Sequence, residues 1–531
     1  MPGWNFAEIW ETAADALPEA PFAKQGDRTV TWRDADRRAD GLARTLLDAG
    51  ATKQDKVAQY LYNGPEYLET VFACFKASLV PVNTNYRYAE DELVYLWDNA
   101  DAVAVVFHGT FAPTIEAIRS RVPNVKTWLW VDDGSGPCPA WATPYEDAAA
   151  TETDRVIPDH GRDGDDLYML YTGGTTGMPK GVMWRQDDLA VILGAGLGLA
   201  VPEEYDPSFL ETAFEAPGPV GMPACPLMHG TGAFTSFGTL SSGGCVVTLP
   251  SRHFDPAELL DEIDDKGVNA IAIVGDAFAK PILGALDANP GRWTLESVLA
   301  FVSSGVMWSE ETKKGMLEHR PEMLLMDAFS SSEALGMGQS VSGGGAAAKT
   351  ARFEPGLNTI VVGDDGERVT EPGEIGRLAV GGRQPIGYYK DEEKTAKTFL
   401  VVDGNRYSCP GDYATLDDDG TIIVLGRGSV CINTGGEKVY PEEVEEAVKT
   451  HASVRDAVVV GVPHERFGEM IVAVVEPAGD STDEEALIEH VRGRLAAYKA
   501  PRRVVEVESI GRAANGKVDY KRLREQAVSS L

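Results

Sequence analysis

The stretch YTGGTTGMPKG, residues 171–181, contains four glycines and three threonines together with one proline and one lysine. It begins at the end of DLYMLY (166–171), an apolar run typical of a buried β-strand. Glycines let the backbone turn and approach a ligand, while backbone N–H groups, threonine hydroxyls and a lysine can donate to phosphate oxygens. The stretch therefore predicts a phosphate-binding loop after a strand. It differs from the common GxxxxGK[ST] loop, because Lys180 follows Pro179 and no serine or threonine follows the lysine.

Strand-like runs and amphipathic stretches alternate on both sides of this loop. AVAVVF (102–107) and AIAIVG (270–275) are strand-like, whereas residues 32–50 have helical periodicity. This alternation predicts the α/β class, with parallel sheets covered by helices.

The pattern changes twice toward the C-terminus. VVGDDGERV (361–369) and LDDDGTIIVLG (416–426) each place Asp-Gly between strand-like runs, which predicts hairpins and a small β-rich subdomain. After GRGSV, a helix-like stretch and further strands predict a compact α+β domain. We therefore expect a large domain over residues 1–427 and a small one over residues 428–531.

The composition argues against several classes of protein. The net charge of −34 at pH 7 disfavours nucleic acid and anionic membranes, which are bound through lysine and arginine. The first twenty residues lack the features of a secretory signal, and the glycine-broken apolar run 189–201 is shorter than the ~20 residues that span a bilayer. The six cysteines lack metal-ligand spacing, which favours reduced thiols and no structural zinc. We expect a cytoplasmic protein without stable membrane insertion.

Five further motifs follow in order along nearly the whole chain. They are PLMHGTGAF (226–234), MDAFSSSEALG (326–336), YSCPGDYATLDDDG (407–420), GRGSVCINTGGEKVYPEEVEEAV (426–448) and GRAANGKVDYKRLRE (511–525). With them, the chain resembles the adenylate-forming superfamily of acyl-CoA synthetases, luciferases and peptide-synthetase adenylation domains. The resemblance implies a large N-terminal adenylate-forming domain, with α/β subdomains and a small β-rich subdomain, and a small mobile C-terminal α+β domain.

The resemblance also implies which residues bind ATP. Phe329 would cover the adenine, and Glu333 would hold Mg²⁺, a hard cation that suits carboxylate oxygen. Ser330 stands where the family has glycine, which narrows the space beside the nucleotide. The other nucleotide-binding positions are Ser332 near the phosphate, and Asp412 and Arg427 at the ribose. The phosphate-binding positions are Thr172, Gly173, Gly174, Thr175, Thr176, Gly177 and Lys180.

For catalysis, the resemblance places Lys517 at the family's catalytic lysine and His229 beside the substrate carboxylate. A carboxylate becomes an acyl donor by attacking the α-phosphorus of ATP, because AMP is then the leaving group. Lys517 and Mg²⁺ would neutralise the charge that gathers there. The small domain would then rotate about Ser429, and Gly435 and Gly436 would let the CoA thiol arm pass close to the backbone.

The acyl pocket is predicted from small and apolar residues. They are Gly275, Ala277, Phe278, Gly305, Met307 and Trp308. The stretches LYMLYTGGTTGMPKGVMWRQ, IVGDAFAKPIL and RFEPGLNT are similar to actinobacterial-type acyl-CoA synthetases that activate steroid side-chain carboxylates.

We therefore expect an ATP-dependent, AMP-forming acid–CoA ligase of a hydrophobic acid, with ATP, Mg²⁺ and coenzyme A as cofactors and a steroid side-chain carboxylate as substrate. A medium- or long-chain fatty acid is the alternative substrate, and transfer of the acyl-adenylate to another acceptor is the alternative reaction. A nucleotide-binding pseudoenzyme is the hypothesis from a different class. Oligomeric state, including a homodimer, stays open.

Overall fold

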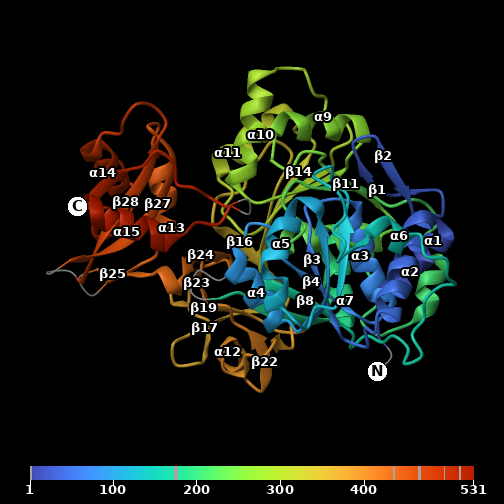
Figure 1. Ribbon diagram of the computed structural model, residues 1–531. Coiled ribbons are helices and arrows are strands. Elements are labelled where there is room, and N and C mark those ends of the chain that lie inside the picture. Colours follow the sequence, from blue (N-terminus) through green and yellow to red (C-terminus); the bar gives the residue numbers. More distant parts are fainter. Residues whose placement is uncertain (1–2, 173–177, 435–436, 465–467, 496, 514–515) are drawn as a thin grey trace.

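The structure, a computed structural model, describes residues 3–172, 178–434, 437–464, 468–495, 497–513 and 516–531 of the 531-residue chain. Figure 1 shows a large body, coloured blue to orange, and a smaller red C-terminal body beside it. The described strands form three sheets, the third of which contains strands of the C-terminal body alone. The fold is the mixed α/β class that the sequence predicts.

The first sheet runs through the middle of the chain into the β-rich subdomain. Its strands, in spatial order, are β18 (Arg368–Val369), β17 (Thr359–Val362), β19 (Ile375–Val380), β23 (Asp412–Leu416), β24 (Ile422–Arg427), β16 (Arg352–Pro355), β15 (Ala334–Ser342), β14 (Leu324–Ser331), β13 (Ala300–Ser303), β12 (Ala270–Ile273), β10 (Val220–Pro223), β11 (Cys245–Thr248), β1 (Pro21–Gln25) and β2 (Arg28–Thr31), with β21 (Phe399–Val402) and β22 (Asn405–Ser408) attached at β19. The strands from β11 to β14 are parallel, and pairing becomes antiparallel from β15 onward. Because β16 pairs with both β15 and β24, the β-rich subdomain continues this sheet.

The second sheet carries the predicted phosphate loop. Its strands, in spatial order, are β20 (Gly387–Tyr388), β9 (Lys180–Arg185), β8 (Leu167–Thr172), β4 (Val80–Asn83), β3 (Lys56–Tyr60), β5 (Ala102–His108), β6 (Thr127–Val131) and β7 (Thr143–Pro144). Its parallel strands are apolar on both faces, as expected for strands covered by helices on both sides. The loop joins β8 to β9, which are antiparallel.

Helices cover these two sheets (Figure 1). They are α1 (Phe6–Ala16), α2 (Trp32–Asp48), α3 (Pro65–Lys76), α4 (Glu90–Asn99), α5 (Ala112–Ile118), α6 (Tyr145–Ala149), α7 (Gln186–Leu197), α8 (Gly230–Ser241), α9 (Pro256–Lys266), α10 (Asp276–Ala288), α11 (Glu310–His319) and α12 (Glu392–Thr398). An aromatic core joins α1, α3 and α8, where the Phe6 ring lies 5.2 Å from Phe75 and 5.8 Å from Phe237 between centroids. Burial of such large rings is the main stabilising contribution here.

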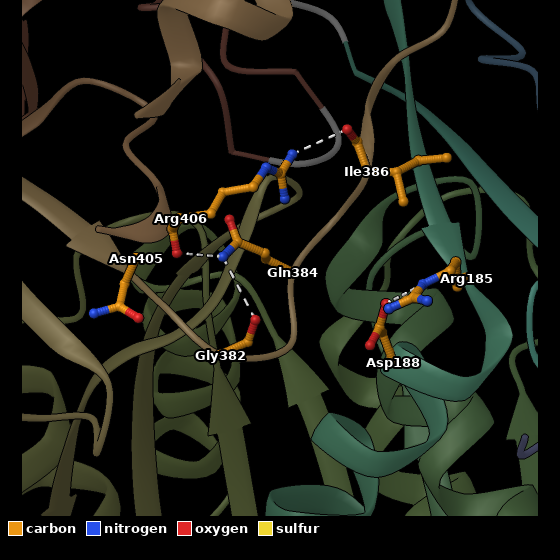
Figure 2. A pocket seen from close by; sticks show the side chains of 7 residues that line it. All are labelled: Arg185, Asp188, Gly382, Gln384, Ile386, Asn405 and Arg406. Carbon is orange, nitrogen blue, oxygen red and sulfur yellow. Dashed lines mark hydrogen bonds and ion pairs between the residues drawn. The ribbon is translucent and has the colours of Figure 1, made fainter. Parts of the chain in front are cut away.

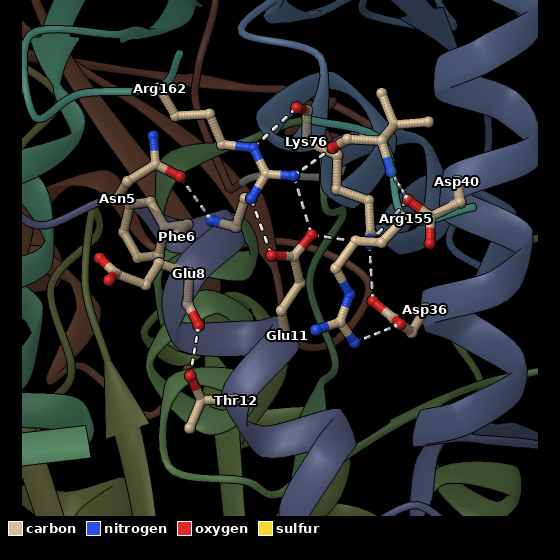
Figure 3. A network of polar contacts seen from close by, with 12 residues as sticks. Asn5, Phe6, Glu8, Glu11, Thr12, Asp36, Asp40, Lys76, Arg155 and Arg162 are labelled. Atoms are coloured by element: carbon tan, nitrogen blue, oxygen red, sulfur yellow. Dashed lines mark hydrogen bonds and ion pairs between the residues drawn. The ribbon is translucent and has the colours of Figure 1, made fainter. Parts of the chain in front are cut away.

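A buried ionic network links the first three helices (Figure 3). The Lys76 ammonium is fully buried at the end of α3 and lies 2.8 Å from Glu11 on α1 and 2.7 and 2.9 Å from Asp36 and Asp40 on α2. Arg162, in the segment that leads to β8, also pairs with Glu11 at 2.7 Å. The network therefore fastens the segment before the phosphate loop to the helical layer.

The C-terminal body has its own sheet and two cores. Its strands are β25 (Ile432–Thr434), β26 (Glu437–Val439), β27 (Val454–His464), β28 (Gly468–Pro477) and β29 (Arg503–Glu506), and its helices are α13 (Pro441–Lys449), α14 (Glu484–Arg492) and α15 (Tyr520–Ser530). One core lies under α13 and α14, and the other under α15. The boundary at residues 427 and 428 stays a prediction.

No helix in the described ranges is long and apolar enough to cross a membrane.

Candidate active site

The phosphate loop is rooted at the ends of β8 and β9, where Thr172 pairs with Lys180 across the ladder. Gly173, Gly174, Thr175, Thr176 and Gly177 lie outside the described residues. Asn83, buried at the end of β4, donates through Nδ2 to the carbonyls of Tyr171 (2.9 Å) and Met228 (2.7 Å), and its Oδ1 accepts from Tyr171 N–H at 2.6 Å. One amide thus joins the root of the loop to the segment that carries His229.

The charged side chains predicted for the phosphates, Lys180, and for Mg²⁺, Glu333, both contact one short segment. Lys180 forms an ion pair with Asp391, and Glu333 Oε1 accepts a hydrogen bond from the Tyr388 hydroxyl at 2.8 Å. Tyr388 is buried on β20, which pairs with β9. Residues 388–391 therefore lie against both the loop root and the predicted metal ligand.

The predicted adenine residue lies near the end of β14. The Phe329 ring packs on Phe353 with centroids 5.2 Å apart; Phe353 belongs to the core of the β-rich subdomain, and the partly buried Phe329 packs against that core. The Ser330 hydroxyl accepts a hydrogen bond from Gly336 N–H at 3.1 Å. The Ser332 carbonyl accepts from the Trp184 indole at 3.0 Å. The strand that leads to Glu333 is thus fastened to β9.

The predicted ribose residues face each other in the sheet. Asp412 is buried at the start of β23, and its Cα partner in the ladder is Arg427 at the end of β24. The register therefore places the two positions side by side, as their predicted contact with one ribose requires.

The charge of Lys517 acts on His229 although the two residues lie in different bodies. The pKa of His229, the N-cap residue of α8, falls to about 3, because burial disfavours the imidazolium and the charges of Lys517 and Arg87 add to the effect. His229 is therefore neutral at pH 7. Lys517 and Arg87 supply positive charge around it, which suits an anionic group such as a carboxylate or a phosphate.

The loop before Lys517 packs against the large body. Gly516 has a φ of +72°, and a Cβ atom there would lie 2.9 Å from Val306 Cγ2 and 3.3 Å from Val274 Cγ1. Within the C-terminal body, Arg512 donates to Asp456 at 2.9 Å and to the Gly516 carbonyl at 3.1 Å. The lysine is therefore presented by a braced loop that contacts the predicted acyl segment.

Part of the predicted acyl pocket differs from the expectation. Trp308 is fully buried in the core beneath α10 and α11, and Phe278 packs there against Phe254 with ring centroids 4.7 Å apart. A Cβ atom at Gly275 would lie 2.5 Å from the carbonyl oxygens of Val306 and Met307, so this glycine permits close backbone packing rather than adding room. In this structure the three positions are therefore packing positions, and their place in the acyl pocket stays a prediction.

The remaining predicted acyl residues are more accessible. Ala277 and Met307 are half-buried, and Gly305 is exposed with a φ of +96°. A Cβ at Gly305 would approach Val274 and Thr231 no closer than 3.7 Å. Of the predicted acyl residues, Ala277 lies with Val274 and Val306 against Gly516.

A hollow of about 360 Å³ lies elsewhere, between the start of α7 and the β-rich subdomain (Figure 2). Its lining residues are Arg185, Asp188, Gly382, Gln384, Ile386, Asn405 and Arg406. Arg185 stands at the opposite end of β9 from Lys180, roughly 17 Å away at the usual rise per strand residue. The hollow contains none of the predicted site residues.

Sequence reasoning missed several contributors to the site. Asn83, Arg87, Tyr388 and Asp391 lie outside the motifs quoted for the resemblance. Asn83 closes a buried, apolar strand, which is the only local signal that its amide has buried partners.

Comparison with known proteins agrees with this arrangement. Residues 10–389 match the family model described as AMP-binding enzyme, and residues 443–517 match that of the AMP-binding enzyme C-terminal domain. The structure is similar to that of ATP-bound MatB from Rhodopseudomonas palustris, with a TM-score of 0.81, 26% identity and coverage of 99% of this chain and 100% of that one. The chain belongs to the AMP-binding enzyme family.

Within that family, the chain is an AMP-forming acyl-CoA ligase. It is 40% identical over 541 residues, 98% of this chain and 96% of the relative, to a protein named 3-oxocholest-4-en-26-oate–CoA ligase from Rhodococcus rhodochrous. It is 39% identical over 531 residues, 98% of this chain and 96% of the relative, to a Mycobacterium tuberculosis protein named medium/long-chain-fatty-acid–CoA/3-oxocholest-4-en-26-oate–CoA ligase.

Proposed function

We propose that the chain converts a steroid side-chain carboxylate, ATP and CoA into the acyl-CoA, AMP and pyrophosphate. The names of the Rhodococcus and mycobacterial relatives support this substrate class. The observation that carries the assignment of the site is the charge of Lys517 beside His229, at a wall of small and apolar residues.

In the first half-reaction, a carboxylate oxygen attacks the α-phosphorus and the bond to pyrophosphate breaks. Lys517 stabilises the charge shared by the carboxylate and the α-phosphate. Neutral His229 lies beside the carboxylate and can donate a hydrogen bond to it without changing the net charge. Arg87 adds a second cation near the same point.

ATP would lie along the residues placed above. Phe329 covers the adenine, Asp412 and Arg427 hold the ribose, and the segment 172–177 with Lys180 and Ser332 holds the phosphates. Ser330 binds Gly336 N–H across its own hairpin, which fits a close approach of the nucleotide to the backbone.

Magnesium fits the donor set at Glu333. One oxygen of this carboxylate accepts from Tyr388, and a carboxylate has a second oxygen for a hard cation that otherwise binds phosphate oxygens and water. Mg²⁺ bound there would supply positive charge to the departing phosphates. Among the described residues no group of three His, Cys, Asp or Glu side chains could hold a metal.

In the second half-reaction, the CoA thiol attacks the acyl carbonyl and AMP leaves. This step needs the space that Lys517 occupies. We infer that the C-terminal body, residues 428–531, rotates about Ser429 in the short helical turn Gly428–Val430. Gly435 and Gly436, which lie outside the described residues, would then line the path of the thiol.

The test is a screen of pyrophosphate release and CoA thioester formation over steroid, medium-chain, long-chain and aromatic acids. We expect the highest kcat/KM for a steroid side-chain carboxylate. Turnover confined to short or aromatic acids would refute the substrate class, and turnover of none would favour a pseudoenzyme.

A medium- or long-chain fatty acid is the second candidate, because the mycobacterial relatives are named for both acids. A kcat/KM for such acids above that of every steroid acid would make it the principal substrate. Pyrophosphate release without thioester, restored by an amine acceptor, would instead indicate transfer to another acceptor.

A further inference from the structure

Two charged groups assigned to the phosphate site contact residues of a single segment, 388–391, far from both in sequence. Tyr388 lies 55 residues after Glu333 and donates to its Oε1 at 2.8 Å. Asp391 lies 211 residues after Lys180 and pairs with its ammonium through Oδ2. A single segment of four residues thus orients both the Glu333 carboxylate and the Lys180 ammonium.

The chain on the N-terminal side of this segment is firmly held. Arg406 donates to the carbonyls of Pro385 and Ile386 at 2.8 and 2.9 Å, and Figure 2 shows its guanidinium directed at the Ile386 carbonyl. Arg383 pairs with Asp188 on α7 at 3.0 Å. The residues that enter the segment are therefore fixed to both the β-rich subdomain and α7.

The C-terminal side is held by a helix cap. Asp391 is the N-cap of α12, where its Oδ1 accepts from Lys394 N–H at 2.9 Å. Thr395 accepts from Tyr388 N–H at 2.9 Å and donates to the Asp391 carbonyl at 2.8 Å. The cap fixes the carboxylate plane, so the oxygen left for Lys180 has a defined position.

The Tyr388 ring has little freedom. It is 6% exposed and packs edge-on against Phe399 with centroids 6.2 Å apart. A buried phenol on a fixed ring presents its hydroxyl in one direction, so the hydrogen bond restricts the rotamers of the Glu333 side chain.

We propose that the segment 388–391 positions the charged groups of the phosphate site, with Tyr388 orienting the Glu333 carboxylate toward Mg²⁺ and Asp391 orienting the Lys180 ammonium toward the phosphates of ATP. This rests on the proposed roles of Glu333 and Lys180. Both groups are held before ATP arrives, so less reorganisation is needed when it binds.

The first test is calorimetric ATP binding without any acid, in Mg²⁺ and in EDTA. Tyr388→Phe is expected to raise the Kd in Mg²⁺ about 5- to 10-fold and to leave the Kd in EDTA within twofold, because the lost hydroxyl acts on the metal ligand. Tyr389→Phe is the matched control, since the Tyr389 hydroxyl donates to Asp101 at 2.7 Å instead. The role of Tyr388 is overturned if Tyr388→Phe and Tyr389→Phe change the Kd for ATP equally, or if Tyr388→Phe weakens ATP binding equally in Mg²⁺ and in EDTA.

The second test separates the charge of Asp391 from its cap. Asn caps helices as well as Asp, so Asp391→Asn removes the ion pair and keeps the cap. We expect a Kd for ATP about 3- to 10-fold higher in both buffers, and no effect of Asp391→Asn when Lys180 is already replaced in Lys180→Met. Asp255→Asn, at the N-cap of α9, should change nothing. Tighter ATP binding by Asp391→Asn would show that Asp391 competes with ATP for Lys180, which overturns the positioning role.

Glu333→Gln shows whether the metal assignment itself holds. It is expected to abolish the advantage of Mg²⁺ over EDTA. If that advantage persists in Glu333→Gln, both the metal assignment and this inference fail. If it is lost in Glu333→Gln and kept in Tyr388→Phe, the inference alone fails.

Discussion

Gly516 offers a direct test of whether contact between the two bodies controls adenylation. In Gly516→Ala, the new Cβ would lie 2.9 Å from Val306 Cγ2, about 1 Å inside ordinary carbon–carbon contact. Overpacking of this kind costs about 1–3 kcal/mol, which corresponds to about a 5- to 150-fold loss of the orientation that brings Lys517 to His229. In the proposed mechanism, the second half-reaction does not use that orientation.

The assay compares the two half-reactions. We expect Gly516→Ala to reduce acid-dependent exchange of pyrophosphate into ATP by this factor, and to leave thioester formation from supplied acyl-adenylate and CoA nearly unchanged. Adding Val306→Ala should restore part of the loss, because it removes the atom in the way.

Gly511→Ala is the matched control. Gly511 has a similar φ of +69°, but a Cβ there would meet Arg522 of the same body. The backbone strain in Gly511→Ala is comparable to that in Gly516→Ala, whereas the new Cβ does not reach the large body. An equal fall of both half-reactions in Gly516→Ala, or the same loss of exchange in Gly511→Ala, would refute the reasoning.

Three further predictions concern the charged groups. Lys517→Ala should abolish pyrophosphate exchange while thioester formation from supplied acyl-adenylate persists; equal loss of both would contradict the two-orientation mechanism. The pKa of His229 is about 3, below its ordinary 6.5, so as the pH falls the unfolded chain is protonated at this histidine before the folded chain is. The stability that comes with the neutral imidazole is therefore complete above pH 6.5 and is lost as the pH falls toward 3. Denaturant unfolding gives the unfolding free energy at pH 7 and at pH 5. Between these two pH values His229→Asn should lose about 2 kcal/mol less of it than the wild type, and equal losses would contradict the lowered pKa. Lys76→Met leaves two buried carboxylates, Glu11 and Asp40, and the half-buried Asp36 without their shared cation and should cost about 3–5 kcal/mol of unfolding free energy, whereas an unchanged melting temperature would show that the network adds no stability.

The sequence predicts the fold class, the order of the motifs and the family, because turn chemistry and residue periodicity are local signals. It does not predict the contact of Tyr388 with Glu333, since nothing in either stretch encodes a partner 55 residues away. It also predicts a pocket wall from Phe278 and Trp308, and in the structure both side chains are buried in the core. Apolar side chains next to a cavity and apolar side chains beneath it have the same composition, so their placement depends on tertiary packing alone.

The β-rich subdomain shows a similar limit. Its Asp-Gly hairpins are local and predict its presence, yet its attachment depends on β16, a four-residue strand that pairs with β15 and β24 at once. Such a short strand carries no strong pattern of its own, so the continuity of the sheet from Phe329 to Asp412 is a property of the folded chain.

The amide of Asn83 holds both the root of the predicted phosphate loop and the segment that carries His229, which are the proposed ATP and acid ends of the site. A carboxylate in its place could not donate to the carbonyls of Tyr171 and Met228, and a hydrocarbon could neither donate nor accept. Spontaneous deamidation at this one side chain would therefore loosen both substrates at the same moment. The working lifetime of the enzyme therefore depends on how well the buried strand Val80–Asn83 excludes water from the Asn83 amide.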